Sequence, residues 1–296
     1  MIPTRTFEYL DMGCTLARLI FVPVYTTLSE SEFLHVFNHS DSKGVMLTHR
    51  NLTFDTNAHA ILQTAGPQHK MLSLLPLCHA YERTMNYEFQ QLGISIYYAE
   101  NLSTIARDLA SFHGDGFCAV PRVLEMMYSK LEAAGKSLKG VKRIIYRWAW
   151  RFANNYDNKR TGFLYRFQHR LADKLVYSKW RDNLGGHEMW VVTGGAAIRP
   201  NIIRLFTAAK LHIFQGYGMT EASPVISVNP PADNVLGTNG TPLGGTELKI
   251  AGDGEILVRG PHVMKGYYKD EKATRMIIDS DGWLHTGDIE TPTVLQ

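Results

Sequence analysis

Two glycine-containing segments in the second half of the sequence carry residue types that suit a flat, phosphate-bearing ligand. They read Thr193-Gly194-Gly195-Ala196 and Gly216-Tyr217-Gly218-Met219-Thr220-Glu221. Glycines at strand ends let the backbone approach a ligand closely, and backbone amides there can face a phosphate. An aromatic ring supplies a stacking surface, a hydroxyl can bind a phosphate oxygen, and a carboxylate is a hard ligand for Mg²⁺. The segments therefore predict a nucleotide site in which Tyr217, Thr220 and Glu221 supply these three functions.

The second segment has other interpretations. Taken alone, Gly216-Tyr217-Gly218 is also typical of a structural turn. It is not the dinucleotide-binding fingerprint GxGxxG, because Glu221 stands in place of the third glycine.

A third segment, Asp281-Gly282-Trp283-Leu284-His285-Thr286-Gly287-Asp288, ends in a carboxylate. A carboxylate that follows a Thr-Gly turn can accept hydrogen bonds from two vicinal hydroxyls, such as those of a ribose. Asp288 is therefore a candidate ribose ligand, and alone it also fits a turn or a helix cap.

The elements that must position these residues follow an α/β pattern, because apolar runs end in glycine or proline and lead into helical periodicity. We expect a helix that begins at Pro121 and stops at Gly135. Apolar runs at 94–98, 189–192 and 211–214 predict strands, and a helix that opens at Pro200 joins the last two. Such a β-α-β unit places its loops at the carboxyl ends of strands, where α/β sheets bind ligands.

The character of the sequence changes after Pro230-Pro231. Two short runs, Glu247–Ile250 and Glu255–Val258, are joined by Ala251-Gly252-Asp253-Gly254 and predict a β-hairpin. We therefore expect an α/β core over residues 1–230 and a small β-rich subdomain over residues 231–296.

Composition excludes several classes of protein. With 296 residues, 45% of them hydrophobic, the chain can bury a substantial core. A formal charge of +3 is too mild to indicate a nucleic-acid partner. Three widely spaced cysteines without zinc-like spacing are typical of a reducing cytoplasm. The apolar stretch 16–25 is shorter than the ~20 residues of a membrane span, and the N-terminus lacks a signal-peptide pattern.

Residues 136–181 form a basic stretch in which tryptophan, phenylalanine and tyrosine lie between lysines and arginines. The stretch contains two acidic residues, Asp157 and Asp173. The pattern predicts a pair of amphipathic helices. Such a pair can lie on the surface of an anionic membrane, or it can be a solvated hairpin that packs its aromatic side chains on the core.

Seven motifs resemble, in their order, the adenylate-forming acyl-CoA synthetases, especially the bacterial long-chain fatty acid:CoA ligases. They are GVMLTHRNL, LLPLCHAYERT, VPRVLE, TGGAAI, GYGMTEASP, GEILVRGPHVMKGYY and DGWLHTGD. The resemblance implies a layered αβαβα large domain with a small β-rich subdomain. It also implies an AMP-forming reaction, in which ATP and a fatty acid give acyl-AMP and pyrophosphate, and CoA then displaces AMP.

The resemblance implies roles for single residues. Tyr217 matches the aromatic stacked on adenine, and Asp288 matches the ribose ligand. Thr220 matches the contact of the α-phosphate, and Glu221 matches the magnesium carboxylate. His79 matches a histidine near the carboxylate and acyl entrance, and it also fits a core histidine. The backbone around the nucleotide comes from Gly194, Gly195, Ala196, Gly216, Gly218 and Met219.

The sequence departs from this family at the phosphate loop. The family has a Ser/Thr/Gly-rich loop before Pro-Lys-Gly-Val, whereas here Val36-Phe37-Asn38-His39-Ser40-Asp41-Ser42 precedes Lys43-Gly44-Val45. An internal deletion near residues 40–43 would leave this junction. Lys43 stays a candidate contact of the nucleotide phosphates, but the loop amides that assist pyrophosphate departure are missing. We therefore expect ATP turnover to be impaired.

A second departure is at the end of the sequence, which stops at Gln296 soon after Asp288. The family continues into a small mobile domain whose lysine contacts the adenylate. We expect that domain, and the domain alternation that serves the thioester step, to be absent from this chain.

Three hypotheses remain open. The first is a long-chain fatty acid:CoA ligase that uses ATP, Mg²⁺ and CoA, with an aryl or amino-acid carboxylate as the alternative substrate. The second is a non-catalytic remnant that binds AMP, acyl-AMP or a fatty acid. The third is a gene fragment that does not fold stably. We expect a cytoplasmic protein without a nucleic-acid partner, peripheral to the inner face of the membrane through residues 136–181.

Overall fold

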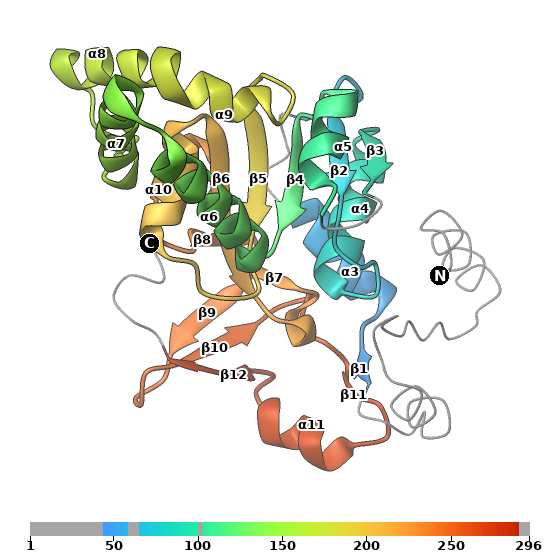
Figure 1. Ribbon diagram of the computed structural model, residues 1–296. Coiled ribbons are helices and arrows are strands. Elements are labelled where there is room, and N and C mark those ends of the chain that lie inside the picture. The colour runs from blue at the N-terminus through green and yellow to red at the C-terminus, as the bar shows by residue number, and fades with distance from the viewer. Residues whose placement is uncertain (1–43, 59–64, 100–102, 290–296) are drawn as a thin grey trace, which may run out of the picture.

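The computed structural model describes residues 44–58, 65–99 and 103–289 (Figure 1). Lys43 and the predicted junction at residues 36–43 lie outside these ranges. The strands are β1 (Val45–Met46), β2 (Lys70–Ser73), β3 (Ser95–Tyr98), β4 (Gly116–Ala119), β5 (Met189–Thr193), β6 (Leu211–Gly218), β7 (Val225–Val228), β8 (Thr241–Pro242), β9 (Glu247–Ile250), β10 (Glu255–Arg259), β11 (Gly266–Tyr267) and β12 (Leu284–Ile289).

Helices of three types lie between some of these strands. The α-helices are α3 (His49–Ala58), α4 (Ala80–Gln91), α5 (Ile105–Phe112), α6 (Pro121–Ser137), α7 (Gly140–Asn154), α8 (Phe163–Ala172), α9 (Ser178–Asp182), α10 (Pro200–Ala208) and α11 (Glu271–Ile277). A π-helical turn, η1 (Asp173–Tyr177), joins α8 to α9, and two 3-10 turns are η2 (Thr220–Ala222) and η3 (Pro231–Asp233).

The largest sheet has the strand order β3-β2-β4-β5-β6-β7-β8. The five strands from β3 to β6 are parallel, whereas β7 and β8 are antiparallel to their neighbours. The predicted strands and the β5-α10-β6 unit are confirmed, with β3 beginning one residue later than expected. Because β2, β4, β5 and β6 run parallel, their carboxyl ends meet at one edge of the sheet, where α/β sheets bind ligands.

Successive side chains of a strand point to opposite faces of this sheet, and each face packs against its own hydrophobic cluster. Phe117, Val191 and Ile213 point into a cluster that contains side chains of α5, α6, α7, η1 and α10. Their neighbours Cys118 and Val192 point into a second cluster, which contains side chains of α4. A sheet that buries both faces under helices is an α/β architecture, as the sequence predicts.

The predicted stop of a helix at Gly135 is wrong, because α6 continues to Ser137. Gly135 is buried, and a Cβ atom there would lie 2.1 Å from the Tyr146 ring of α7. The glycine therefore permits the close contact of α6 with α7, and it does not end the helix.

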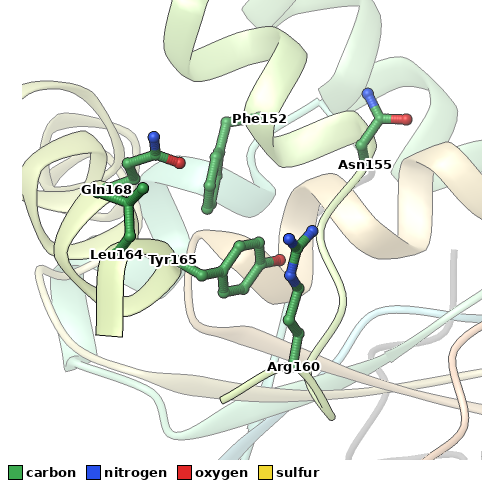
Figure 2. Close-up of a pocket in the computed structure, with 6 residues that line it drawn as sticks. All are labelled: Phe152, Asn155, Arg160, Leu164, Tyr165 and Gln168. Atoms are coloured by element: carbon green, nitrogen blue, oxygen red, sulfur yellow. The ribbon is translucent and has the colours of Figure 1, made fainter. Parts of the chain in front are cut away.

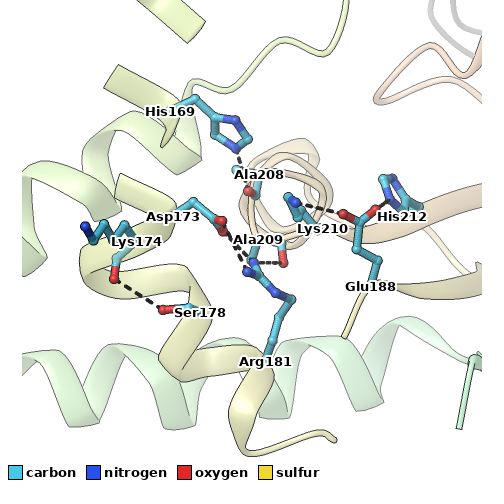
Figure 3. A network of polar contacts seen from close by, with 10 residues as sticks. All are labelled: His169, Asp173, Lys174, Ser178, Arg181, Glu188, Ala208, Ala209, Lys210 and His212. Carbon is cyan, nitrogen blue, oxygen red and sulfur yellow. Dashed lines mark hydrogen bonds and ion pairs between the residues drawn. The ribbon is translucent and has the colours of Figure 1, made fainter. Parts of the chain in front are cut away.

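The segment from α8 to α9 is tied to the end of α10 by a polar network (Figure 3). Arg181 binds both carboxylate oxygens of Asp173 and donates to the carbonyl of Ala209 at 3.0 Å. His169 Nε2 lies 2.8 Å from the carbonyl of Ala208. These contacts satisfy carbonyls at the carboxyl end of α10 and fix the inner face of the segment.

The predicted hairpin is confirmed as β9 and β10, which pair antiparallel and form a three-stranded sheet with β12. Figure 1 shows this sheet on the opposite side of the molecule from α8. It packs on the large sheet through a cluster that contains Ile256, Val258 and Leu284 together with Ala222 and Ile226. The domain boundary at residue 230 stays a prediction. Among the described helices, none combines the length and the apolar character that crossing a membrane requires.

Candidate functional site

Gly216, Tyr217 and Gly218 lie in β6 and pair with β7, so the interpretation of this motif as a turn is wrong. A Cβ atom on Gly218 would lie 1.9 Å from the carbonyl oxygen of Pro224, and one on Gly216 would lie 2.9 Å from that of Ser227. The glycines are therefore required by the close approach of the next strand. The half-buried Tyr217 side chain between them packs against the cluster under the three-stranded sheet.

Tyr217 and Asp288 are 71 positions apart in the sequence, but their side chains are in contact. The Tyr217 hydroxyl donates a hydrogen bond of 2.6 Å to Oδ2 of Asp288. Burial, and then the carboxylate of Asp288, raise the pKa of Tyr217 above its ordinary value, so the hydroxyl stays a donor at neutral pH. The predicted stacking ring and the predicted ribose carboxylate thus come from β6 and β12 to one place.

Glu255 of β10 fixes the turn that carries Asp288. Its carboxylate accepts hydrogen bonds of 2.8 Å from the Gly287 amide and lies 2.8 Å from Nδ1 of His285. The Thr286 hydroxyl donates to the Ile256 carbonyl at 2.8 Å and accepts from the Asp288 amide at 3.2 Å. The role of Glu255 cannot be predicted from the sequence, because nothing local links it to a motif about 30 residues later.

Thr220 and Glu221 lie in η2, which Met219 separates from the end of β6, and Thr220 is exposed whereas Glu221 is half-buried. Oε1 of Glu221 accepts a hydrogen bond of 2.8 Å from the Tyr267 hydroxyl. Burial and this contact raise the pKa of Tyr267 to about 12. Tyr267 lies in the motif GEILVRGPHVMKGYY, but its role cannot be predicted from the sequence, because the pairing of β1 with β11 that brings it here is not visible there.

The magnesium prediction can be tested against the donors around Glu221. Among the described residues, no three His, Cys, Asp or Glu side chains are close enough together to hold a metal ion. Mg²⁺ is commonly held by one or two carboxylates together with substrate phosphates and water. The residues present therefore fit an ion shared between Glu221 and a nucleotide phosphate, and do not fit an all-protein cage.

The Gly194–Ala196 turn lies beside the start of the Gly-Tyr-Gly motif. A Cβ atom on Gly194 would lie 3.1 Å from the carbonyl oxygen of Gly216. Gly195 adopts a φ of 80°, which favours glycine, and Gly195 and Ala196 are exposed. Met219 is extended and packs with Tyr217 on the three-stranded sheet. The two predicted backbone segments are thus adjacent.

His79 lies elsewhere on the same edge of the sheet, at the N-cap of α4 after the loop that follows β2. It is exposed, which contradicts its interpretation as a core histidine, and partial burial of its ring lowers its pKa. Two strands, β4 and β5, separate β2 from β6. His79 is therefore placed at the common edge, and its role stays a prediction.

Buried polar contacts brace the segments that carry the site. The Asn51 side chain of α3 donates to the carbonyls of Pro261 and Val263 at 2.7 and 2.8 Å. The Thr84 hydroxyl of α4 donates to the Ser223 carbonyl at 3.2 Å, and Ser223 donates to the His262 carbonyl at 2.7 Å. Satisfied buried groups hold one arrangement of η2 and its neighbours. The site is therefore supported by helices from the first third of the chain.

Together these contacts create a preformed ring–carboxylate pair beside a glycine-lined edge. The ring can stack on a planar base, the exposed Asp288 can accept from hydroxyls, and Glu221 can share a cation with phosphate. This set of donors and acceptors is complementary to a nucleoside monophosphate.

Known proteins resemble the chain in sequence. The sequence pattern of the AMP-binding enzymes matches residues 40–268. The peroxisomal long chain acyl-CoA synthetase 7 of Arabidopsis thaliana is 34% identical over 264 residues, which are 83% of this chain and 37% of that protein. The putative fatty-acid–CoA ligase fadD11 of Mycobacterium tuberculosis is 36% identical over 83% of this chain and 45% of its own length. The chain thus spans less than half of these curated relatives.

Solved structures resemble the chain in fold. O-succinylbenzoate coenzyme A synthetase from Bacillus subtilis, solved in complex with AMP, matches with a TM-score of 0.57 and 23% identity over 83% of this chain and 44% of that one. The N-terminal domain of FACL13 from Mycobacterium tuberculosis matches with a TM-score of 0.59 and 19% identity over 83% of this chain and 54% of that one. The predicted α/β fold class is therefore confirmed.

Proposed function

Because the chain belongs to the family of AMP-binding enzymes, we propose that the carboxyl end of β6 binds AMP or an acyl-adenylate. The observation that carries this proposal is the hydrogen bond of 2.6 Å between Tyr217 and Asp288. It holds a stacking ring and a hydroxyl acceptor at a fixed separation before any ligand arrives, and such preorganisation lowers the ordering cost of binding.

The parent activity in this proposal is long-chain fatty acid:CoA ligation, which converts ATP, fatty acid and CoA into acyl-CoA, AMP and pyrophosphate. Two curated relatives of the chain, at 34% and 36% identity, are named as an acyl-CoA synthetase and a fatty-acid ligase. Tyr217 and Asp288 hold the adenosine, and the Thr220 hydroxyl faces the α-phosphate. Mg²⁺ on Glu221 neutralises phosphate charge when bound. His79 lies on the acyl side, and the Gly194–Ala196 backbone lines the space between.

The alternative is a non-catalytic remnant that binds AMP or acyl-adenylate without turnover. The sequence favours this alternative at one place, since residues 36–42 before Lys43 contain no glycine. A loop that wraps the β- and γ-phosphates needs backbone amides that glycines expose. A ligase for another carboxylate would retain the same adenosine contacts and differ on the acyl side.

Calorimetry with AMP tests the binding site, and pyrophosphate exchange into ATP tests turnover. We expect saturable AMP binding, which Asp288→Asn weakens by about tenfold because a hydroxyl acceptor loses its charge. Asp281→Asn is the matched control, since this exposed carboxylate lies in the same segment and should bind AMP as the wild type does. Absence of AMP binding, or equal loss in both variants, contradicts the proposal.

Pyrophosphate exchange into ATP then distinguishes the ligase from the non-catalytic remnant. A fatty-acid-dependent exchange supports the ligase, whereas AMP binding without exchange supports the remnant. The protein is further proposed to act in the cytoplasm, where residues 136–181 contact the inner face of a membrane.

A further inference from the structure

The outer face of α8 exposes large apolar side chains. Phe163 is 88% exposed, Leu164 66% and Phe167 56%, and Leu171 continues the same face. Residues at these spacings lie on one side of an α-helix. Exposed aromatic residues at successive turns of one helix are unusual for a surface that faces water alone.

Cations flank this apolar face. Arg166, Arg170 and Lys174 recur at every fourth position beside it, and all three are exposed. Among the described residues no carboxylate forms an ion pair with them, whereas Arg181 on the inner side is paired with Asp173. The whole stretch 136–181 contains six lysines and seven arginines against two aspartates. The face therefore combines apolar bulk with unneutralised positive charge.

A small pocket opens beside the same face, between the end of α7 and the start of α8 (Figure 2). Its volume is about 220 Å³, below the ~300–1,000 Å³ of pockets that enclose drug-sized ligands. Leu164 and Tyr165 line it together with Arg160, whose guanidinium lies 4.9 Å from the centre of the Tyr165 ring. Oδ1 of the nearby Asp157 accepts a hydrogen bond of 2.9 Å from the Lys159 amide. The pocket has the size and the donor for one anionic head group.

The inner side of α8 is fixed, so the outer face is presented as a rigid surface. His169 and Arg181 tie the segment to the end of α10 (Figure 3). The Tyr177 hydroxyl donates to the Ala149 carbonyl of α7 at 2.7 Å, and the Trp150 and Trp180 rings pack between the helices. The predicted packing of aromatic side chains on the core holds for this inner side, while the phenylalanines of α8 point outward.

We propose that the outer face of α8 and the pocket beside it form a docking surface for an anionic phospholipid bilayer. Phe163, Leu164 and Phe167 enter the interfacial layer, the basic stripe contacts lipid phosphates, and Arg160 binds one head group in the pocket. Apolar side chains beside a cationic stripe are the arrangement of interfacial amphipathic helices. A bilayer can bury the apolar side chains and bind the cationic stripe, whereas a free phosphate would leave the phenylalanines in water.

The inference deepens the proposed function, on which it rests for the substrate, because a long-chain fatty acid partitions into bilayers. Figure 1 shows α8 on the side of the molecule away from the three-stranded sheet that carries Asp288. A bilayer bound to α8 therefore leaves the proposed adenosine contacts open to water. Docking and nucleotide binding can be measured separately.

The experiment is co-sedimentation of the full chain with vesicles of phosphatidylglycerol and phosphatidylcholine, compared with vesicles of phosphatidylcholine alone. We expect the wild type to pellet with the anionic vesicles and to be released as salt rises. The double variant Phe163→Ser, Phe167→Ser should bind at least about tenfold more weakly, since burial of two aromatic side chains is lost. Arg166→Glu with Arg170→Glu should abolish the preference for anionic vesicles.

Met276→Ser is the matched control, because Met276 on α11 is 73% exposed but lies outside this face. It should pellet like the wild type. Circular dichroism and the thermal midpoint check that each variant is folded, as expected for exposed positions. Arg160→Ala should reduce binding to anionic vesicles and leave binding to neutral vesicles unchanged.

The outcomes separate this inference from the proposed function. A folded wild type that stays in solution with anionic vesicles, or a phenylalanine variant that pellets like Met276→Ser, overturns the docking surface. Displacement from vesicles by excess inorganic phosphate at constant ionic strength also overturns it in favour of a free phosphate. Calorimetry with AMP reports on the nucleotide site in either case.

Discussion

The roles of single residues depend on partners that are far away in sequence. Tyr217 and Asp288 were predicted from their chemistry, since few side chains can stack on a base or accept from two hydroxyls. Glu255 and Tyr267 were missed, although they fix the turn before Asp288 and contact Glu221. Their function arises from side-chain contacts across 30 and 46 positions, which no local pattern encodes.

Glu82 of α4 is a buried residue whose charge should affect stability. It accepts hydrogen bonds of 2.6 Å from the Ser73 hydroxyl and 3.2 Å from the Leu74 amide, while Oε2 has no partner among the described residues. Burial raises its pKa from 4.5 to about 7, against the opposing effect of these hydrogen bonds. The folded protein therefore holds a proton that the unfolded chain releases between these pH values.

Stability should consequently fall as pH rises from about 4.5 to about 7, by up to ~3 kcal/mol from this group. Glu82→Gln keeps the acceptor oxygen and removes the ionisation, so its free energy of unfolding should decline less over the same range. Urea unfolding at pH 5 and pH 8 measures the difference, with Glu271→Gln as an exposed control. Parallel pH profiles for wild type and Glu82→Gln would show that Glu82 does not ionise in this window.

At the scale of elements, the positions of β5, α10, β6 and the β9–β10 hairpin could be predicted, because their periodicity and bounding glycines or prolines are local. The functions of two glycines could not. Gly135 and Gly218 both suggest breaks in structure, yet Gly135 belongs to α6 and Gly218 is the last residue of β6, and a neighbouring element approaches each of them closely. The neighbours, α7 and β7, are set by tertiary packing.

Gly218→Ala should therefore destabilise the protein strongly. The added Cβ atom would lie 1.9 Å from the carbonyl oxygen of Pro224, and a backbone atom cannot rotate away as a side chain can. Separation of β6 from β7 should lower the free energy of unfolding by at least about 2–3 kcal/mol, measured by chemical denaturation. Gly252→Ala is the control, since a Cβ atom there meets nothing within 4 Å and stability should stay within about 0.5 kcal/mol. Equal stability of the two variants would contradict the strand contact.

At the scale of the whole molecule, the candidate site lies where two sheets join. Tyr217 and Met219 extend from the large sheet into a cluster with Ile256 and Leu284 of the three-stranded sheet. The ring–carboxylate hydrogen bond crosses the same junction. A ligand held by both partners must therefore stabilise the junction as well as the residues that it touches.

AMP should accordingly stabilise both sheets together. At a concentration one hundred times its Kd, a ligand that binds the folded state alone adds about 2.7 kcal/mol, which should raise the Tm by several degrees. Hydrogen exchange should slow in β6 and in β12 at once, because neither strand can separate from the other without losing a contact to the nucleotide. Asp288→Asn should retain slower exchange in β6 and lose it in β12. If AMP protects β6 while β12 of the wild type exchanges as before, the nucleotide contacts one sheet alone, and Asp288 is not its ribose ligand.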